Sequence, residues 1–280
     1  MQQLLSRADY GAIASSLEPP RAAFVDGGFR PGSGPAFETV NPATGETVCE
    51  IAGCGEADVD FAVGKAREAF ARGPWRRMHP SERKDVLIRL AKLMTRNRRE
   101  LAVMESLDSG KPIRDCELVD VPEAINTLKW HAEAADKLYD QVAPSGDAAI
   151  AMIVREPVGV VAAVLPWNFP LLMLAWKLGP ALAAGNAVIA KPAEQTPLTA
   201  LRVAELAAEA GVPRGVLQVL PGDGPSVGAP LGLHPDVDMV SFTGSTDTGR
   251  RFLRYAADSN LKRVVLECGG KNPAIVLADA

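Results

Sequence analysis

Residues 160–191 read VVAAVLPWNFPLLMLAWKLGPALAAGNAVIAK, which is an apolar strand, a helix and a second apolar strand in succession. The strands are predicted at Val160–Leu165 and Ala187–Ala190, with a helix at Leu171–Ala184 between them. Every position of both strands is apolar, which is typical of strands buried on both faces of a parallel sheet. The stretch therefore predicts an α/β fold in which helices cover both faces of a parallel sheet.

The same alternation continues through the rest of the chain. Further strands are predicted at Val216–Leu220, Val237–Phe242, Val264–Leu266 and Ala274–Leu277. The helices between them are predicted at Pro197–Ala210, Ser226–Leu233 and Thr246–Ala257. Ligands bind such sheets beyond the carboxyl ends of the strands, so the functional residues are expected to follow the strands.

The residues before 160 are predicted to be mostly helical. Helical periodicity covers Glu56–Arg72, Pro80–Asn97, Arg99–Ser109 and Val121–Tyr139. Short strands are predicted within Phe24–Phe29 and Phe37–Ile51, with a turn at 41–45. Residues 1–20 are expected to be an irregular lead-in, and residues 144–157 an extended ribbon.

Composition limits the class of protein. The 280 residues are 47% hydrophobic and 23% charged, which fits a globular fold. A formal net charge of -4 gives no reason to expect nucleic acid or an anionic membrane as a partner. No stretch predicts a membrane span or a secretory leader, and the four cysteines match neither a zinc site nor a disulfide framework. We therefore expect a cytoplasmic protein without a structural metal.

Two of the strand ends carry polar side chains. The loop Pro166-Trp167-Asn168-Phe169-Pro170 is held by two prolines, and the Asn168 amide could stabilise an oxyanion. The alternative is a turn asparagine bonded to its own backbone. After the next strand, Lys191 and Glu194 could hold the hydroxyls of a ribose, and the acid would favour NAD over NADP. A solvated ion pair is the alternative there.

The last two strand ends are rich in glycine. Phe242-Thr243-Gly244-Ser245-Thr246-Asp247-Thr248-Gly249 runs from a strand into a helix start that could bind a phosphate, or into an ordinary capped helix. The G-x-G-x-x-G fingerprint is absent, and Gly222-Asp223-Gly224 is its nearest approximation. Glu267, before two glycines, could be a general base. Cys268 could be a nucleophile, although a small buried hydrophobic residue is the favoured interpretation.

Six motifs in one order carry a resemblance to a known family. They are Asn-Pro-Ala-Thr-Gly-Glu at 41–46, Leu-Asp-Ser-Gly-Lys-Pro at 107–112, Pro-Trp-Asn-Phe-Pro at 166–170, Lys-Pro-Ala-Glu-Gln-Thr-Pro at 191–197, Phe-Thr-Gly-Ser-Thr at 242–246 and Leu-Glu-Cys-Gly-Gly-Lys at 266–271. Together they resemble the NAD(P)-dependent aldehyde dehydrogenase superfamily. The resemblance implies a Rossmann-like NAD-binding domain over 21–143 and 158–280, and an oligomerisation ribbon that includes 144–157.

The resemblance also implies roles for single residues. Asn168 would stabilise the oxyanion, and Glu267 would be the general base. The residues implied to bind NAD are Pro166, Trp167, Lys191, Glu194, Gly224, Pro225, Gly244, Ser245, Thr246, Gly249, Glu267 and Gly269. Within this set, Lys191 and Glu194 would hold the adenosine ribose, and Ser245 would contact the pyrophosphate. Trp176 would face the aldehyde, although core packing is an equal alternative.

The sequence departs from the family in one respect. The nucleophilic cysteine of the family lies in a separate catalytic domain beyond the glutamate, whereas these residues end at Ala280, 13 residues after Glu267. We therefore expect no dehydrogenase activity from the chain alone, and exposed apolar surface that favours oligomers or a complementary C-terminal chain. The alternatives are a noncatalytic NAD-binding or scaffold protein and a different reaction at Cys268.

Local sequence also resembles the aminoaldehyde subgroup, which includes enzymes for γ-glutamyl-aminobutyraldehyde. The resemblance rests on Cys268, on Asp120-Val121-Pro122 and on Trp130 followed by Asp136-Lys137-Leu138-Tyr139-Asp140. Asp120 could attract the ammonium group of such a substrate. An aspartate at a helix start is the alternative interpretation of Asp120.

Overall fold

A seven-stranded sheet forms the centre of the computed structural model, which describes residues 4–270 and 272–280. Residues 1–3 of the expected lead-in and Lys271 of the sixth motif lie outside the described residues. The strand order is β11-β10-β7-β8-β9-β1-β2. The strands are β1 (Ala23–Val25), β2 (Gly28–Arg30), β7 (Val160–Val164), β8 (Ala187–Lys191), β9 (Leu217–Val219), β10 (Met239–Gly244) and β11 (Arg263–Cys268).

The direction of the chain across this sheet reverses at β7. Strands β7, β8 and β9 follow one another to one side, and β10 then returns to pair with the opposite side of β7. All five strands from β11 to β9 are parallel, whereas β1 and β2 add an antiparallel hairpin at the edge. In open α/β sheets the ligand crevice lies where this reversal occurs, so the order places a site beyond β7 and β10.

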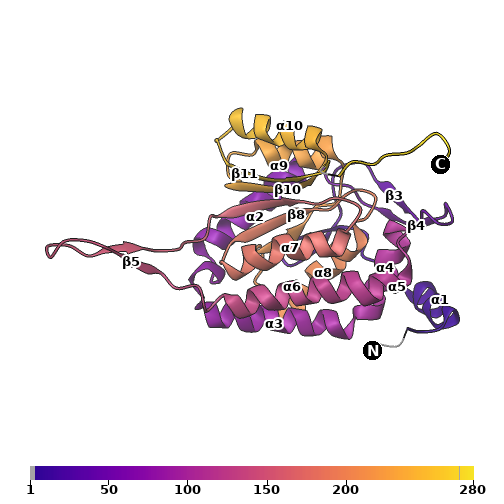
Figure 1. Cartoon of the computed structure of the whole chain (residues 1–280), viewed down its shortest axis with the longest axis horizontal. Helices are drawn as coiled ribbons and strands as arrows, with labels where there is room; N and C mark the ends of the chain where they lie inside the picture. The colour runs from indigo at the N-terminus through magenta and orange to yellow at the C-terminus, as the bar shows by residue number, and fades with distance from the viewer. Residues whose placement is uncertain (1–3, 271) are drawn as a thin grey trace.

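Helices cover both faces of the sheet, as predicted (Figure 1). One face packs against α2 (Glu56–Arg72), α9 (Ala229–Leu233) and α10 (Thr246–Ala257). The other face packs against α7 (Pro170–Ala183) and α8 (Leu198–Ala210). Behind these two lie α3 (Pro80–Arg96), α4 (Arg98–Ser109) and α6 (Val121–Ala134), with the short α5 (Ile113–Asp115) between α4 and α6. The α/β class predicted from the alternation is confirmed.

Several boundaries differ from the predictions because of local contacts. Residues 7–16 form a helix, α1 (Arg7–Ser16), where an irregular lead-in was expected. Ser6 accepts a hydrogen bond from the Asp9 amide, and the Asp9 carboxylate accepts one from the Ser6 amide, which together cap the helix. Helix α6 ends at Ala134 instead of Tyr139, because the next turns leave the core: Leu138 and Tyr139 are 69% and 78% exposed.

The strand predicted at Ala274–Leu277 is absent, and that prediction is wrong. Ile275 and Val276 are both 83% exposed, and no described strand lies beside them. A strand needs a neighbour for its backbone hydrogen bonds, so β-branched residues alone do not form one. Strand β11, by contrast, has a neighbour. Among the described strands it pairs with β10 alone, so it is an edge strand.

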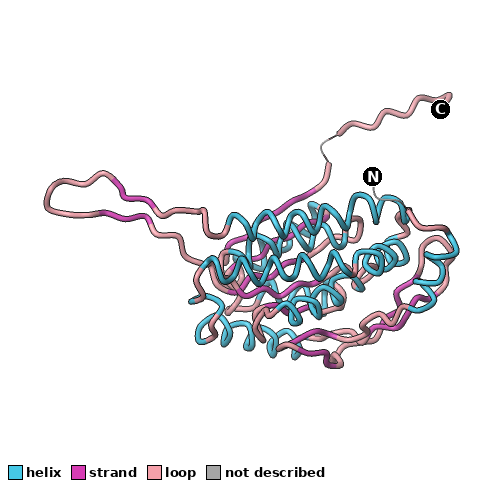
Figure 2. Tube along the Cα trace, turned by 90° about the horizontal axis from the view of Figure 1, so that it is seen from below, coloured by secondary structure: helices cyan, strands magenta, loops and turns pink. Residues whose placement is uncertain are grey.

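Residues 141–153 project from the body as a hairpin (Figure 2). Its strands are β5 (Gln141–Ala143) and β6 (Ala151–Ile153), which pair antiparallel with each other. A second hairpin, β3 (Phe37–Val40) and β4 (Thr47–Ile51), encloses the predicted turn at 41–45. The ribbon expected around 144–157 is therefore present as the tip and second strand of the projecting hairpin.

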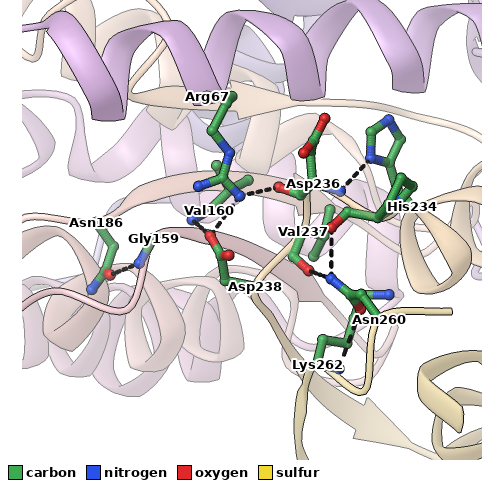
Figure 3. A network of polar contacts seen from close by, with 11 residues as sticks. Arg67, Gly159, Val160, Asn186, His234, Asp236, Val237, Asp238, Asn260 and Lys262 are labelled. Atoms are coloured by element: carbon green, nitrogen blue, oxygen red, sulfur yellow. Dashed lines mark hydrogen bonds and ion pairs between the residues drawn. The ribbon is translucent and has the colours of Figure 1, made fainter.

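A polar network connects the strands at their amino ends, which lie opposite the carboxyl ends that carry the motifs (Figure 3). The Asp238 carboxylate accepts hydrogen bonds from the Val160 amide at 2.7 Å and from the Arg67 guanidinium at 2.7 Å. The Asn186 side chain accepts one from the Gly159 amide at 2.9 Å. These contacts join α2 to the starts of β7, β8 and β10.

In the described part of the chain, no helix is long and apolar enough to span a membrane.

We expect Gly159→Ala to lower the free energy of unfolding by about 2–4 kcal/mol, through backbone strain and overpacking. Gly159 has a φ of +135°, and a Cβ there would lie 1.8 Å from an Asp238 carboxylate oxygen. Urea denaturation measures the change. Gly146→Ala is the control, because a Cβ at Gly146 meets no atom within 4 Å. Equal stability of the two variants would contradict this account of the network.

Candidate active site

A cleft of about 820 Å³ opens at the point where the strand order reverses. The cleft is formed by the loops that follow β7, β8, β9, β10 and β11. Of the residues predicted from the sequence, the cleft is lined by Pro166, Trp167, Asn168, Lys191, Glu194, Gly224, Pro225, Gly244, Ser245, Glu267 and Gly269. Residues that are more than 100 positions apart in the chain therefore share one cavity.

The loop after β7 presents Asn168 to this cleft. Pro166 precedes it, and Pro170 is the first residue of α7, so both sides of the loop are restrained. Trp167 and Asn168 are exposed. Within residues 4–270 and 272–280, the Asn168 carboxamide has no hydrogen-bond partner. It is therefore not the self-bonded turn asparagine of the alternative interpretation, and its N–H groups can donate to a ligand.

Lys191 and Glu194 form an ion pair at the mouth of the cleft after β8. The Lys191 side chain is 6% exposed, and its ammonium lies 3.1 Å from the carboxylate of Glu194, whose side chain is 42% exposed. Burial raises the pKa of Glu194, but the charge of Lys191 and hydrogen bonds outweigh this and leave the pKa below its ordinary value. The carboxylate is thus charged at neutral pH and can accept hydrogen bonds from hydroxyl groups.

The loop after β10 ends in a capped helix start. Ser245 is the N-cap of α10, and its hydroxyl accepts a hydrogen bond from the Thr248 amide at 3.2 Å. Thr246 is exposed in the first turn but does not line the cleft. The other amides of this turn have no acceptor within the helix, so a phosphate beside Ser245 would meet free N–H groups and a positive dipole end.

Gly249, predicted to bind the cofactor, does not line the cleft. It is buried on the side of α10 that faces β11. A Cβ at Gly249 would lie 3.0 Å from the Cys268 sulfur and 3.3 Å from the Leu266 side chain. The glycine therefore lets α10 pack closely on β11, which positions the phosphate-facing helix start.

Glu267 and Cys268 point to opposite faces of β11. Alternate residues of this edge strand are exposed, and Glu267 lies on the exposed face. Cys268 lies on the side that packs against α10, with Leu266. Both residues line the cleft, Glu267 from the exposed face of β11 and Cys268 from the face that packs against α10.

Lys177 is a charged residue close to Glu267 that was not predicted from the sequence. Its ammonium donates hydrogen bonds to Ser241 at 3.1 Å and to Thr243 at 2.9 Å, both on β10. Burial lowers the pKa of Lys177 to about 8, and the charge of Glu267 acts in the opposite direction. The signal was present in the sequence, because Lys177 is the one charged residue in the apolar run of α7.

Two buried carboxylates on α4, which were not predicted from the sequence, bind the starts of α7 and α8. These helices follow the Asn168 loop and the Lys191 loop. Glu105 accepts hydrogen bonds from the Leu171 amide at 3.2 Å and the Thr199 hydroxyl at 3.1 Å. Asp108 accepts one from the Leu198 amide at 3.0 Å. Leu171 and Leu198 lie in the first turns of α7 and α8, where amides lack partners within the helix. One helix thus fixes both the Asn168 loop and the Lys191 loop.

The structure does not bring the two predicted substrate residues into the cleft. The Asp120 side chain is 2% exposed and pairs with Lys111, whose ammonium lies 3.6 Å from the centre of the Phe169 ring. Asp120 therefore supports the Asn168 loop from behind and is not open to a substrate ammonium. Trp176 is 56% exposed in a separate groove between α6 and α7, so it is not a core tryptophan.

Comparison with known proteins identifies the family. The profile of the aldehyde dehydrogenase family matches residues 29–280. The chain belongs to the aldehyde dehydrogenase family. The chain is 64% identical over 280 residues to aminoacetaldehyde dehydrogenase of Pseudomonas aeruginosa, covering 100% of this chain and 56% of that protein. The family resemblance drawn from the six motifs is confirmed.

Solved aldehyde dehydrogenases share the fold. Indole-3-acetaldehyde dehydrogenase AldA of P. syringae, in complex with NAD+, is 50% identical with a TM-score of 0.95, covering 99% of this chain and 56% of that chain. The γ-glutamyl-γ-aminobutyraldehyde dehydrogenase of Burkholderia cenocepacia is 53% identical with a TM-score of 0.93, covering 95% and 54%. The chain therefore spans little more than half the length of these relatives.

Proposed function

We propose that this chain is the NAD-binding part of an enzyme that oxidises an aldehyde to a carboxylate with NAD. The observation that carries the proposal is the cleft, where an ion pair, a capped helix start and a free carboxamide meet beyond β7 and β10. The relative in complex with NAD+ supports the choice of cofactor. A noncatalytic NAD-binding protein is the second candidate, but it has no use for Asn168 and Glu267 in the cleft.

Three loops, those after β8, β9 and β10, would hold NAD in this proposal. Glu194 and Lys191 hold the hydroxyls of the adenosine ribose, with Gly224 and Pro225 beside the adenine. The start of α10 would hold the pyrophosphate, with Ser245 and the amides of the first turn as donors. A charged carboxylate at the ribose repels a 2′-phosphate, which favours NAD over NADP.

The chemistry lies at the β7 and β11 ends of the cleft. NAD held in the cleft would supply the acceptor for the hydride that leaves the former aldehyde carbon once a nucleophile has added to it. Asn168 donates an N–H to the aldehyde oxygen as negative charge develops there. Glu267 takes a proton from the attacking thiol or water, and the charge of Lys177 stabilises the Glu267 carboxylate. Removing a single oxyanion donor costs on the order of a hundred- to a thousandfold in rate.

These 280 residues alone do not supply the thiol nucleophile in our proposal. Burial raises the pKa of Cys54 and Cys116 to about 12, and burial also raises the pKa of Cys49. Cys268 faces α10, on the opposite side of β11 from Glu267. A reactive cysteine needs an accessible thiolate, and Cys268, which is half-buried at the cleft, is packed against α10 instead of lying on the Glu267 side of β11.

The substrate and the assembly are proposed from the relatives. Two matched proteins are named for aminoaldehydes, aminoacetaldehyde and γ-glutamyl-γ-aminobutyraldehyde, and we assign the same class to this chain. The β5–β6 hairpin exposes Val142, Ile150, Met152 and Ile153, an apolar surface that suits association between copies of the complete enzyme. The domain division at 21–143, 144–157 and 158–280 follows the same proposal.

Calorimetric titration with NAD, together with an NADH assay over a panel of aldehydes, tests the function. We expect the chain to bind one NAD, and Lys191→Ala to weaken this binding roughly tenfold through loss of a buried charge-assisted contact. Lys129→Ala is the control, because Lys129 is 57% exposed and lies on α6. We expect no NADH formation above that of Glu267→Ala. Failure to bind NAD would overturn the proposal, and turnover well above Glu267→Ala would overturn the claim that these residues are inactive alone.

A further inference from the structure

One part of the cleft lies between two helical segments, which follow β9 and β10. The first segment is the π-helix η3 (Gly224–Gly228), which continues directly into α9, and the second is α10. Helices α9 and α10 lie side by side and contact each other (Figure 1). We call this part of the cleft the interhelical slot. Its lining residues are Gly224, Pro225, Gly228 and Ala229 from the first segment, and Thr248, Phe252 and Tyr255 from α10.

The walls of the interhelical slot carry no charge and are held in place by packing. Phe252 is 3% exposed, and its ring centre lies 5.2 Å from that of Phe242 and 5.8 Å from that of Tyr255. A Cβ at Gly228 would lie 4.0 Å from the Phe252 ring, so the two segments approach closely. Small residues on one side and a fixed aromatic cluster on the other suit a flat, uncharged ring such as a nucleobase.

Arg251 is the charged side chain that α10 presents to the cleft. It is exposed and lines the cleft, and within the part of the chain that the structure describes it makes no hydrogen bond or ion pair. The adjacent Arg250 differs in both respects, because it does not line the cleft and it pairs with Asp247 at 3.1 Å. A guanidinium is planar and stacks readily on the face of an aromatic ring.

The position of Arg251 along α10 suits a contact with a base more than one with a phosphate. Ser245, Thr248 and Arg251 all line the cleft and are three residues apart, so they share one side of the helix. With a rise of 1.5 Å per residue, Arg251 lies about 9 Å along the axis from Ser245. A pyrophosphate at Ser245 therefore leaves Arg251 beside the group that lies one ribose further along the ligand.

We propose that Arg251 stacks its guanidinium on the adenine of NAD and gives the site a preference for a purine base. Adenine has two fused rings, and the ring remote from the ribose reaches Arg251 at the rim of the interhelical slot. A pyrimidine has one ring and ends short of it. The inference deepens the proposed function and rests on it, because it presumes NAD in the cleft with its adenine beside Gly224 and Pro225.

Calorimetric titration of the full chain with NAD and with nicotinamide cytosine dinucleotide tests the proposal. The two ligands share both riboses and the pyrophosphate and differ only in the base, so the ratio of their affinities isolates the contact with the base. We expect Arg251→Met, which keeps an apolar stem without the planar charge, to lower the ratio of NAD to cytosine dinucleotide affinity roughly fivefold. Arg251→Lys keeps the charge without the plane and is expected to restore only part of this ratio.

Arg250→Met is the matched control, since Arg250 is the neighbouring arginine on the same helix and lies outside the cleft with its side chain 65% exposed. It removes the same charge and should leave the ratio unchanged. Both arginines are exposed, so the urea midpoints of all variants should equal that of the wild type.

Equal weakening of the two dinucleotides by Arg251→Met overturns the inference, because it would mean that the charge attracts the pyrophosphate. Full recovery of the ratio in Arg251→Lys overturns it as well, since a plain charge would then suffice. If the wild type binds NAD while the ratio is the same in Arg251→Met, only Arg251 is wrongly assigned. If the wild type does not bind NAD, the proposed function falls, and the role of Arg251 falls with it.

Discussion

Replacing Glu105 by alanine is expected to lower the free energy of unfolding by about 3–5 kcal/mol, the largest stability change we expect from a single polar side chain here. The substitution leaves the Leu171 amide and the Thr199 hydroxyl buried without an acceptor, and it opens a cavity in the core. Each unsatisfied buried donor costs about 1–3 kcal/mol. Such a loss is a large part of the total stability of a typical domain.

Glu105 also makes stability depend on pH. Burial raises the pKa of Glu105 to about 7, whereas the unfolded chain has the ordinary glutamate value near 4.5. Between these values the native state binds more protons than the unfolded state, so stability falls as the pH rises from about 4.5 to about 7. The expected loss is about 3 kcal/mol, at 1.36 kcal/mol per unit of pKa difference.

Urea unfolding of the wild type, Glu105→Ala and Glu105→Gln, repeated across this pH range, measures both effects. Glutamine keeps an acceptor oxygen without the charge, so Glu105→Gln should retain more stability than Glu105→Ala. It should also show a weaker pH dependence between 4.5 and 7 than the wild type, with the contribution of Asp108, whose pKa burial also raises, remaining. Glu100→Gln, a partly exposed position on the same helix, controls for the change of net charge. A pH profile of Glu105→Gln parallel to that of the wild type would contradict the buried carboxylate as the cause.

Glu194→Gln is expected to change the ratio of NADP to NAD affinity by on the order of a hundredfold in favour of NADP, because like charges brought together cost several kcal/mol. The Glu194 carboxylate is charged and lies at the cleft mouth beside Lys191. Its removal takes away the repulsion of a 2′-phosphate and leaves Lys191 free to attract it. NAD itself should bind more weakly, since glutamine accepts hydrogen bonds from a ribose less strongly.

Titration of each variant with both dinucleotides, at two salt concentrations, gives this ratio. The shift should shrink at high salt, because the Glu194 side chain is partly exposed and its field is screened. Glu209→Gln, on the exposed side of α8, is the control for net charge. An unchanged ratio in Glu194→Gln would mean that the ribose lies elsewhere in the cleft.

Local sequence determined the elements well where their signals are local. Helices α2 and α10 have the predicted bounds, Glu56–Arg72 and Thr246–Ala257, because each combines an apolar stripe with acidic residues in its first turn. The N-terminal helix was missed although Ser6 and Asp9 form a capping box that the sequence contains. The strand predicted at Ala274–Leu277 failed because strand formation depends on a partner and not on the segment itself.

The site residues also divide into those that local sequence predicts and those that it does not. The residues that follow the strands could be named from the sequence, since a polar or glycine-rich loop after an apolar strand is a local pattern. The assignment of Asp120 to a substrate ammonium could not be checked from the sequence, because the sequence does not show whether the side chain is buried. In the structure the Asp120 side chain is buried and paired with Lys111.

The sequence by itself determined the α/β class, the family, and which residues follow β7, β8, β10 and β11, because these follow from hydrophobic period and short motifs. Only the tertiary structure decided that β10 returns to the far side of β7, which brings Asn168 and Ser245 to one cleft. It also decided that Glu105 and Asp108 are buried under the starts of α7 and α8. The physical reason is that strand order and burial depend on contacts between residues far apart in the chain, which no local pattern records.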